Sequence, residues 1–175
     1  MGVLSEKVVI VTGASRGLGK AIAMRFADQG AMVAILARTE EPHPRIAGTI
    51  YQTADAIVAA GGVCLPIRCN VGSTEDIENA VNSTLEKFGR IDIVIHNAAA
   101  NFQGGAIDID PNRWDISMNV NPRALFLLAR GSLEALRENG GHIISVSPKL
   151  ENSIRGASPY MLSKQLQTRL TLGLA

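Results

Sequence analysis

Short apolar runs rich in β-branched residues alternate with segments of helical periodicity along this 175-residue chain. Strands that alternate with helices predict a parallel sheet, because each helix carries the chain back to the edge where the next strand starts. We therefore expect one α/β domain over residues 1–175, built as a doubly wound parallel sheet with helices on both faces. The run 91–95 is almost purely apolar, so we place it centrally. The expected strands are 8–11, 32–36, 63–68, 91–95 and 142–146.

The segments between the strands carry helical spacing and helix-end signals. Ser73 is a typical N-cap, with Glu75 and Asp76 in the first turn, where negative charge is favourable. Gly89 ends that helix, and the polar, Pro-rich stretch from Arg38 to Arg45 predicts a loop. The expected helices cover residues 17–29, 49–60, 74–88, 114–137 (one long helix or two joined ones) and 159–174.

The overall charge and hydropathy exclude several classes of protein. Lys and Arg number 17 against 16 Asp and Glu, so no field of one sign attracts nucleic acid or an anionic membrane. No apolar run reaches the roughly 18 residues of a membrane span, and the N-terminus shows no signal peptide. Cys64 and Cys69 lack the spacing of a zinc site or a disulfide framework. We expect a cytoplasmic protein without metal, whose cysteines are reduced and half-buried.

A glycine-rich turn joins the first strand to the first helix. Glycine accepts the backbone angles of a sharp turn, and its missing side chain lets a pyrophosphate approach the backbone. The following helix supplies free N–H groups and the positive end of its dipole. We therefore predict a dinucleotide phosphate site formed by Gly13, Ser15, Arg16, Gly17, Leu18 and Gly19.

The spacing of this turn, Thr-Gly-x-x-x-Gly-x-Gly, resembles the short-chain dehydrogenase/reductase family, whose members open a Rossmann-like domain with it. Asn70 and Val71 follow the third strand, where relatives usually have Asp-Val against the adenine ring. Asn97, Ala98 and Ala99 follow the fourth strand, where relatives usually have Asn-Ala-Gly. Ligands of open α/β sheets bind at the carboxyl ends of the strands. The resemblance therefore implies cofactor contacts from Asn70, Val71, Asn97 and Ala98.

The end of the second strand favours NADP(H) over NAD(H). Rossmann folds that use NAD place an acidic residue there, which binds the ribose 2′-hydroxyl. In this sequence the position is Ala37, and Arg38 follows it. Arg38 can bind a 2′-phosphate bidentately, and Arg16 supplies a second charge. Each arginine alone also fits an ordinary surface position; together with the missing acid they favour NADP(H).

Four polar residues match the family's catalytic tetrad in order and spacing: Asn119, Ser147, Tyr160 and Lys164. Tyr160 and Lys164 are four residues apart on an expected helix, so their side chains can meet one ligand. The resemblance assigns Tyr160 as acid/base and Lys164 to the nicotinamide ribose hydroxyls, where its charge also favours ionised tyrosine. It assigns Ser147 to the substrate oxygen, and Asn119 to a water that relays protons to Lys164.

The segment between the second strand and the next helix is more particular. Its Pro-His-Pro loop and its Gly-Thr-Ile-Tyr sequence resemble the hydroxysteroid dehydrogenase-like type 2 branch, which the pairs Asn119–Asn121 and Ser147–Pro148 also fit. This branch name does not establish a steroid substrate.

The family pattern extends beyond the end of the chain. Members normally continue after the Tyr-Lys helix with a strand, a substrate-covering segment and a last strand, so we interpret this domain as C-terminally truncated at Ala175. The sequence leaves open any continuation beyond Ala175, an organellar targeting signal included. The family also implies a homodimer or homotetramer, formed through the helices near 125–136 and 159–174.

Two classes of function are compatible with these residues. The leading one is an NADP(H)-dependent oxidoreductase that interconverts a carbonyl and a secondary alcohol on a small-molecule substrate. The alternative is a truncated, non-catalytic NADP(H)-binding protein, which would bind NADPH without turnover. Extended relatives such as sugar-nucleotide epimerases tend to use Thr-Gly-x-x-Gly-x-x-Gly, and the spacing here counts against them.

Overall fold

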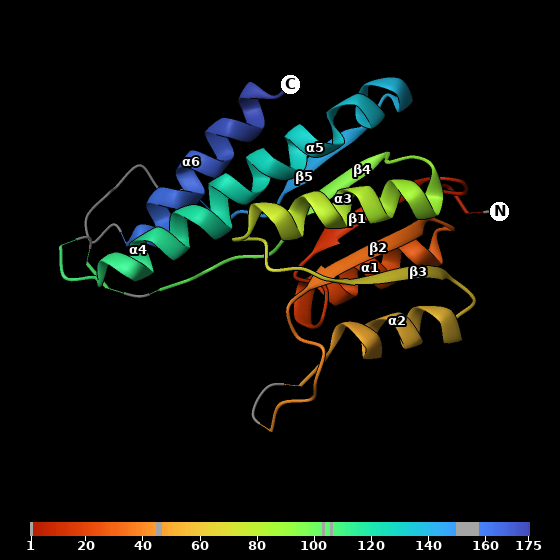
Figure 1. The fold of residues 1–175 in the computed structure, drawn as a ribbon, viewed down its shortest axis with the longest axis horizontal. Coiled ribbons are helices and arrows are strands. Elements are labelled where there is room, and N and C mark those ends of the chain that lie inside the picture. The colour runs from red at the N-terminus through yellow and green to blue at the C-terminus, as the bar shows by residue number, and fades with distance from the viewer. Residues whose placement is uncertain (1, 45–46, 103, 106, 150–157) are drawn as a thin grey trace.

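The computed structural model describes residues 2–44, 47–102, 104–105, 107–149 and 158–175. Its centre is a sheet of five parallel strands in the order β3-β2-β1-β4-β5 (Figure 1). The strand order reverses between β1 and β4, which confirms the predicted doubly wound fold class. The strands are β1 (Val8–Thr12), β2 (Met32–Ala37), β3 (Val63–Arg68), β4 (Ile93–His96) and β5 (His142–Ser145).

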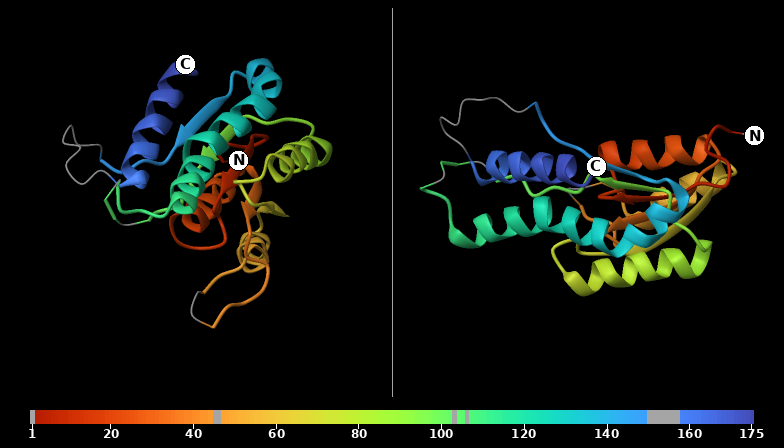
Figure 2. Two further views of the ribbon diagram at one scale, coloured as in Figure 1. Left: turned by 60° about the vertical axis from the view of Figure 1, so that its left-hand side comes forward. Right: turned by 90° about the horizontal axis from the view of Figure 1, so that it is seen from above.

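Helices cover both faces of the sheet. Seen from above, α1 lies on one side of the strands, and α3 and α5 lie on the other (Figure 2). The last helix, α6, packs against β5, α4 and a π-helical turn, η1. The helical elements are α1 (Gly17–Asp28), α2 (Ile50–Ala59), α3 (Thr74–Phe88), α4 (Pro111–Met118), η1 (Asn119–Arg123), α5 (Ala124–Asn139) and α6 (Pro159–Gly173).

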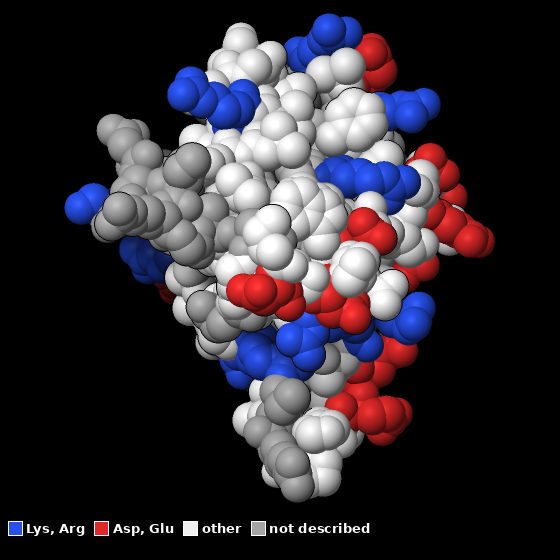
Figure 3. All heavy atoms as spheres, turned by 90° about the vertical axis from the view of Figure 1, so that its left-hand side faces the viewer, with Lys and Arg blue, Asp and Glu red and all other residues white. Residues whose placement is uncertain are grey.

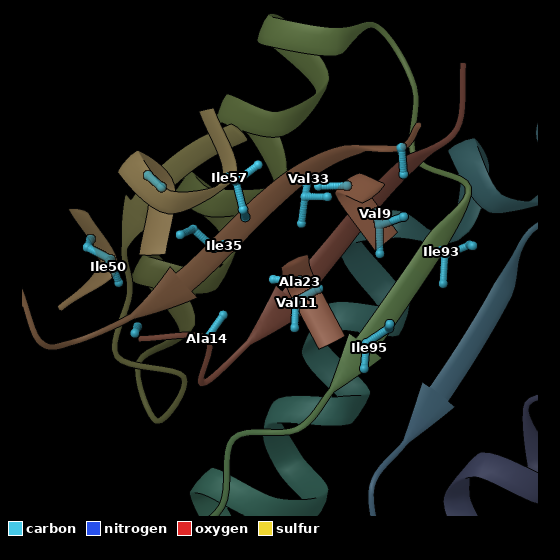
Figure 4. Close-up of a cluster of buried hydrophobic side chains, with 14 residues drawn as sticks. Val9, Val11, Ala14, Ala23, Val33, Ile35, Ile50, Ile57, Ile93 and Ile95 are labelled. Atoms are coloured by element: carbon cyan, nitrogen blue, oxygen red, sulfur yellow. The ribbon is translucent and has the colours of Figure 1, made fainter. Parts of the chain in front are cut away.

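Two hydrophobic cores form because successive residues of a strand point to opposite faces. On one face, Val11 of β1 belongs to a buried cluster with Ala23 of α1 and Ile57 of α2 (Figure 4). On the other face, Ile10 of β1 clusters with Leu128 of α5 and with side chains of α3. A strand buried on both faces reads as a continuous apolar run, which is why the central strands were recognisable in the sequence.

Local signals place the helix ends. The side chains of Thr49, Ser73 and Ser158 cap α2, α3 and α6, each by accepting the backbone N–H of the residue three positions later. Gly89 and Gly140 end α3 and α5 in the left-handed region, at φ values of 75° and 62°. The predicted cap at Ser73 and the predicted stop at Gly89 are therefore confirmed.

The expected long helix is corrected in two ways. It begins at Pro111 rather than at Trp114, because Asp110 caps the first turn and proline suits the first helical position. Pro122 then falls inside the helix, where it has no N–H to donate, and the chain widens into η1. The run 91–95 was expected to be central, and β4 is indeed an interior strand, paired with β1 on one side and with β5 on the other.

The two cysteines agree only in part with the prediction that both are reduced and half-buried. Both cysteines are free, but Cys69 is 1% exposed, whereas Cys64 is partly buried as expected. Burial raises the pKa of each thiol to about 12.

Arg45, the last residue of the expected loop, lies outside the described residues. In the part of the chain that the structure describes, no helix has the length and apolarity to cross a membrane.

Candidate functional site

A cleft with a volume of about 570 Å³ opens at the carboxyl ends of β1, β2, β3 and β4. Figure 3 looks onto this end of the molecule, where Lys and Arg side chains gather in a band bordered by acidic residues. The cleft lies where the strand order reverses, which is the usual ligand position in open α/β sheets. Its lining residues are Gly13, Ser15, Arg16, Leu36, Ala37, Arg38, Thr39, Cys69, Asn70, Val71, Asn97, Ala98, Ala99, Ala100, Phe102, Ile116 and Val120.

The glycine-rich turn forms one wall of the cleft. A Cβ on Gly19 would collide with the carbonyl oxygen of Gly13, so glycine is required for α1 to pack this closely. Gly17 has a left-handed φ of 54°, and a Cβ there would meet nothing within 4 Å. Arg16 provides α1 with no side-chain cap, unlike the caps of α2, α3 and α6. The start of α1 thus offers uncapped N–H groups beside open space, a cradle that fits a pyrophosphate.

The carboxyl ends of β1 and β4 are joined through Thr12, which is completely buried. Its Oγ1 accepts hydrogen bonds of 3.0 Å from the backbone N–H groups of Asn97 and Ala98. The Asn97 side chain in turn donates to the carbonyl oxygens of Thr12 and Gly13, at 3.0 and 3.3 Å. The loop after β4 is therefore held against the glycine-rich turn, and together they form the floor of the cleft.

Basic side chains border the end of β2. The Arg16 guanidinium donates a hydrogen bond of 2.7 Å to Thr39 Oγ1, so it reaches from the glycine-rich turn to the end of β2. Arg38 lines the same part of the cleft. Glu40 is the first acid after β2, and its carboxylate is engaged elsewhere, by the Tyr51 hydroxyl at 2.8 Å and by Arg68 at 3.5 Å.

At the end of β3, Asn70 and Val71 contribute to the opposite rim. The backbone N–H of Asn70 donates to Asp76 Oδ2 at 2.7 Å, and Asn70 Oδ1 accepts from the backbone N–H of Gly72 at 3.2 Å. Val71 is buried. These bonds hold the chain in a tight turn, and both residues line the cleft.

Three members of the expected tetrad lie on η1, after β5 and on α6. Asn119 opens η1, directly before a residue that lines the cleft. Ser147 Oγ accepts a hydrogen bond of 3.3 Å from the Thr168 hydroxyl, which joins the end of β5 to α6. Tyr160 lies partly buried in the first turn of α6. Residues 150–157, which connect Ser147 to α6, lie outside the described residues.

Lys164, the fourth member, has a side chain that is 1% exposed. Its Nζ donates hydrogen bonds of 2.9 Å to the carbonyl oxygen of Val146 and to Gln167 Oε1. Burial lowers the pKa of Lys164 to about 8. The ammonium thus lies against the end of β5, directly before Ser147.

Buried polar residues that the sequence analysis did not single out connect the ends of β1 and β4 to η1 and α6. His96 is completely buried, with Nε2 2.9 Å from the Asn121 carbonyl oxygen and Nδ1 3.3 Å from Thr12 Oγ1. Burial, assisted by the charge of Lys164, lowers the pKa of His96 to about 4, so the ring is neutral at pH 7. Asn121 Nδ2 donates to Ser163 Oγ at 2.8 Å. A continuous polar chain therefore runs from β1 through β4 and η1 to α6.

The predicted residues fall into three groups. Gly17, Leu18 and Gly19 form the first turn of α1 beside the cleft, and Asn119 adjoins the cleft wall. Ser147 follows β5, and Tyr160 and Lys164 lie on α6. None of the three is among the described residues that line the cleft. Those that line the cleft are Gly13, Ser15, Arg16, Arg38, Asn70, Val71, Asn97 and Ala98.

Known proteins are similar to this chain in sequence. Hydroxysteroid dehydrogenase-like protein 2 from Mus musculus is 39% identical and the Homo sapiens protein 38% identical, each over 99% of this chain. The chain spans 36% and 43% of the length of these two relatives. The resemblance to this branch is therefore confirmed.

Solved structures agree with the sequence relatives. A putative dehydrogenase from Xanthomonas campestris superposes with a TM-score of 0.93 at 38% identity, over 100% of this chain and 67% of that one. A metagenomic short-chain oxidoreductase in complex with NADP superposes with a TM-score of 0.88 at 32% identity, over 98% of this chain and 76% of that one. The family model for short chain dehydrogenases matches residues 7–175. This chain belongs to the short-chain dehydrogenase family.

Proposed function

We propose that this chain carries the nucleotide-binding and catalytic residues of an NADP(H)-dependent oxidoreductase that interconverts a carbonyl and a secondary alcohol. The observation that carries the cofactor preference is the end of β2, where Arg16 and Arg38 border the cleft and Ala37 occupies the position of the NAD-specific acid. The NADP complex of the metagenomic relative supports the same cofactor.

Charge at the β2 end argues for a 2′-phosphate. A carboxylate at Ala37 would repel that phosphate, whereas guanidinium groups bind it with charge-assisted hydrogen bonds. The bond from Arg16 to Thr39 holds one guanidinium at this position. Glu40 is bound by Tyr51 and Arg68, so it does not replace the missing acid in the cleft.

The chemistry would be divided among the expected tetrad. NADP(H), when bound, supplies or accepts the hydride. Tyr160 then donates a proton to the alkoxide oxygen in reduction and removes it from the alcohol in oxidation. Ser147 hydrogen-bonds the same oxygen and stabilises its developing charge. Lys164 holds the nicotinamide ribose hydroxyls and favours ionised tyrosine, and Asn119 holds a water through which Lys164 exchanges protons.

The cofactor preference is tested by titrating NADPH and NADH against wild type and Arg38→Ala. Loss of one charge-assisted phosphate contact costs about 1.5–3 kcal/mol, so NADPH should bind about ten- to a hundredfold more weakly while NADH is unaffected. Arg25→Ala is the matched control, because Arg25 is an exposed arginine of α1 that pairs with Asp28. Equal affinity of wild type for NADH and NADPH would refute the preference.

Catalysis is tested with Tyr160→Phe and a panel of aldehydes and ketones, following the loss of NADPH absorbance. Phe keeps the aromatic ring and removes the exchangeable proton, so turnover should disappear while NADPH binding survives. Lys164→Ala should weaken both. Tyr160→Phe with most of the wild-type kcat would refute the assignment, and NADPH binding without turnover across the panel would support the non-catalytic alternative.

A further inference from the structure

Gln167 is a completely buried polar side chain of α6. It lies three residues after Lys164, so the two side chains are neighbours on one side of the helix. Gln167 Oε1 accepts a hydrogen bond of 2.9 Å from Lys164 Nζ, and Gln167 Nε2 donates one of 3.2 Å to the carbonyl oxygen of Val146. A buried amide is costly unless it is hydrogen-bonded, and these two bonds satisfy both ends of the Gln167 amide.

The same contacts orient the lysine. Lys164 Nζ donates to Val146 O and to Gln167 Oε1, both at 2.9 Å. An ammonium group has three N–H donors, and among the described residues we find no acceptor for the third. Among the described residues, the Nζ group is therefore held by one bond to the Val146 carbonyl at the end of β5 and by one bond to Gln167 of its own helix, and its third N–H is left for a ligand.

The neutrality of Gln167 preserves the charge of Lys164. Within the described chain, Lys164 takes part in no ion pair. The buried titratable side chain of β4, His96, is neutral at pH 7 because burial and the Lys164 charge lower its pKa to about 4. An amide dipole holds an ammonium without cancelling its charge, whereas a carboxylate in the same place would cancel it.

We infer that Gln167 is a positioning residue: with the Val146 carbonyl it fixes the Lys164 ammonium, so that one N–H and an uncompensated charge act on Tyr160 and on the nicotinamide ribose. The inference rests on the proposed function and adds a fifth residue to the tetrad. Gln167 acts only through Lys164.

The first test measures the lysine itself, without cofactor. Lys164 is acetylated at a low ratio of acetic anhydride, and labelling is followed by mass spectrometry, with the exposed Lys87 of α3 as internal reference. Gln167→Met has a similar volume but removes both hydrogen bonds, so Lys164 should be labelled faster than in wild type. Gln167→Glu retains an acceptor and adds a charge that raises the pKa of the amine, so labelling should be slower. Equal labelling of Lys164 in all three proteins would overturn the inference.

The second test separates positioning from stability. We expect kcat for carbonyl reduction to fall about tenfold or more in both variants, because each disturbs the group that tunes the acid/base. Gln167→Glu should retain more thermal stability than Gln167→Met, because Lys164 keeps a partner. A purely structural role predicts that kcat follows stability, so a Glu variant with wild-type kcat would overturn the inference.

Thr171→Val provides the matched control on the same helix. Thr171 Oγ1 hydrogen-bonds Ser145 Oγ of β5 at 2.8 Å and donates to the backbone carbonyl of Gln167 at 2.9 Å. This change therefore removes an α6–β5 contact and a bond within the helix, and it leaves the side-chain bonds of Gln167 and Lys164 in place. It should leave both kcat and Lys164 labelling unchanged. A wild type that binds NADPH but reduces no carbonyl would refute the proposed function, and the order of Lys164 labelling would still decide whether Gln167 holds the ammonium.

Discussion

Replacing Thr12 with Val tests whether one buried hydroxyl holds the floor of the cleft. Thr12 Oγ1 accepts the backbone N–H groups of Asn97 and Ala98, both at 3.0 Å. Valine has nearly the same shape and accepts neither bond, and it also lacks the hydroxyl that lies 3.3 Å from the buried Nδ1 of His96. The two N–H groups are only partly buried, so water from the cleft can partly replace the hydroxyl. We therefore expect unfolding free energy to fall by about 1–3 kcal/mol for the pair, rather than by the full cost of two buried orphans.

Thr12→Val should also weaken cofactor binding. Without Thr12 the loop after β4 is free to shift against the glycine-rich turn, so NADPH should bind about three- to tenfold more weakly. Urea unfolding followed by circular dichroism measures the stability, and fluorescence titration with NADPH measures the affinity.

Thr84→Val is the control for this experiment. Thr84 is also completely buried, but its hydroxyl only donates to the Ala80 carbonyl oxygen, at 2.7 Å within α3. Removing it orphans no N–H group, so the expected cost is below about 1 kcal/mol. If Thr12→Val costs no more than Thr84→Val and binds NADPH normally, the hydroxyl does not hold this loop.

The packing and the charges support three further predictions. Gly19→Ala should weaken NADPH binding by about tenfold or more, measured by titration, because the new Cβ would collide with the Gly13 carbonyl and displace the phosphate turn. Gly131→Ala should instead raise the free energy of unfolding by up to about 1 kcal/mol, measured as a higher Tm. Gly131 lies within α5, where alanine is the better helix former, and the new Cβ would make an ordinary contact of 3.4 Å with Val81. Burial opposes the ionisation of Asp92, but hydrogen bonds led by Arg90 lower its pKa to about 2. The resulting stability, about 2 kcal/mol, should be present above pH 4 and lost as pH falls toward 2, and Asp92→Asn should abolish that part of the pH dependence in urea titrations.

The sequence was most informative where one local cause determines the structure. The run Val63–Arg68 and the helix between Ser73 and Gly89 have the predicted bounds, because a short apolar run, an N-cap and a left-handed glycine each act within a few residues. The start at Pro111 was missed although Asp110 and the proline are also local signals. The π-helical turn depends on how a proline is accommodated inside a packed helix, which spacing alone does not reveal.

Chain order and residue type were enough to derive the fold class, the family, the glycine-rich turn and the basic end of the second strand. Which buried polar residues meet depends instead on how the elements pack in three dimensions. His96 ends an apolar strand, and Asn121 and Gln167 lie in helices, so in the sequence each is an isolated polar residue. Packing of β4, η1 and α6 brings His96 to the Asn121 carbonyl and Asn121 to Ser163, and packing of α6 against β5 brings Gln167 and Lys164 to the Val146 carbonyl. Burial then requires that these hydrogen bonds be made. Such contacts join residues far apart in the chain or depend on the direction of a side chain, and the spacing of neighbouring residues predicts neither.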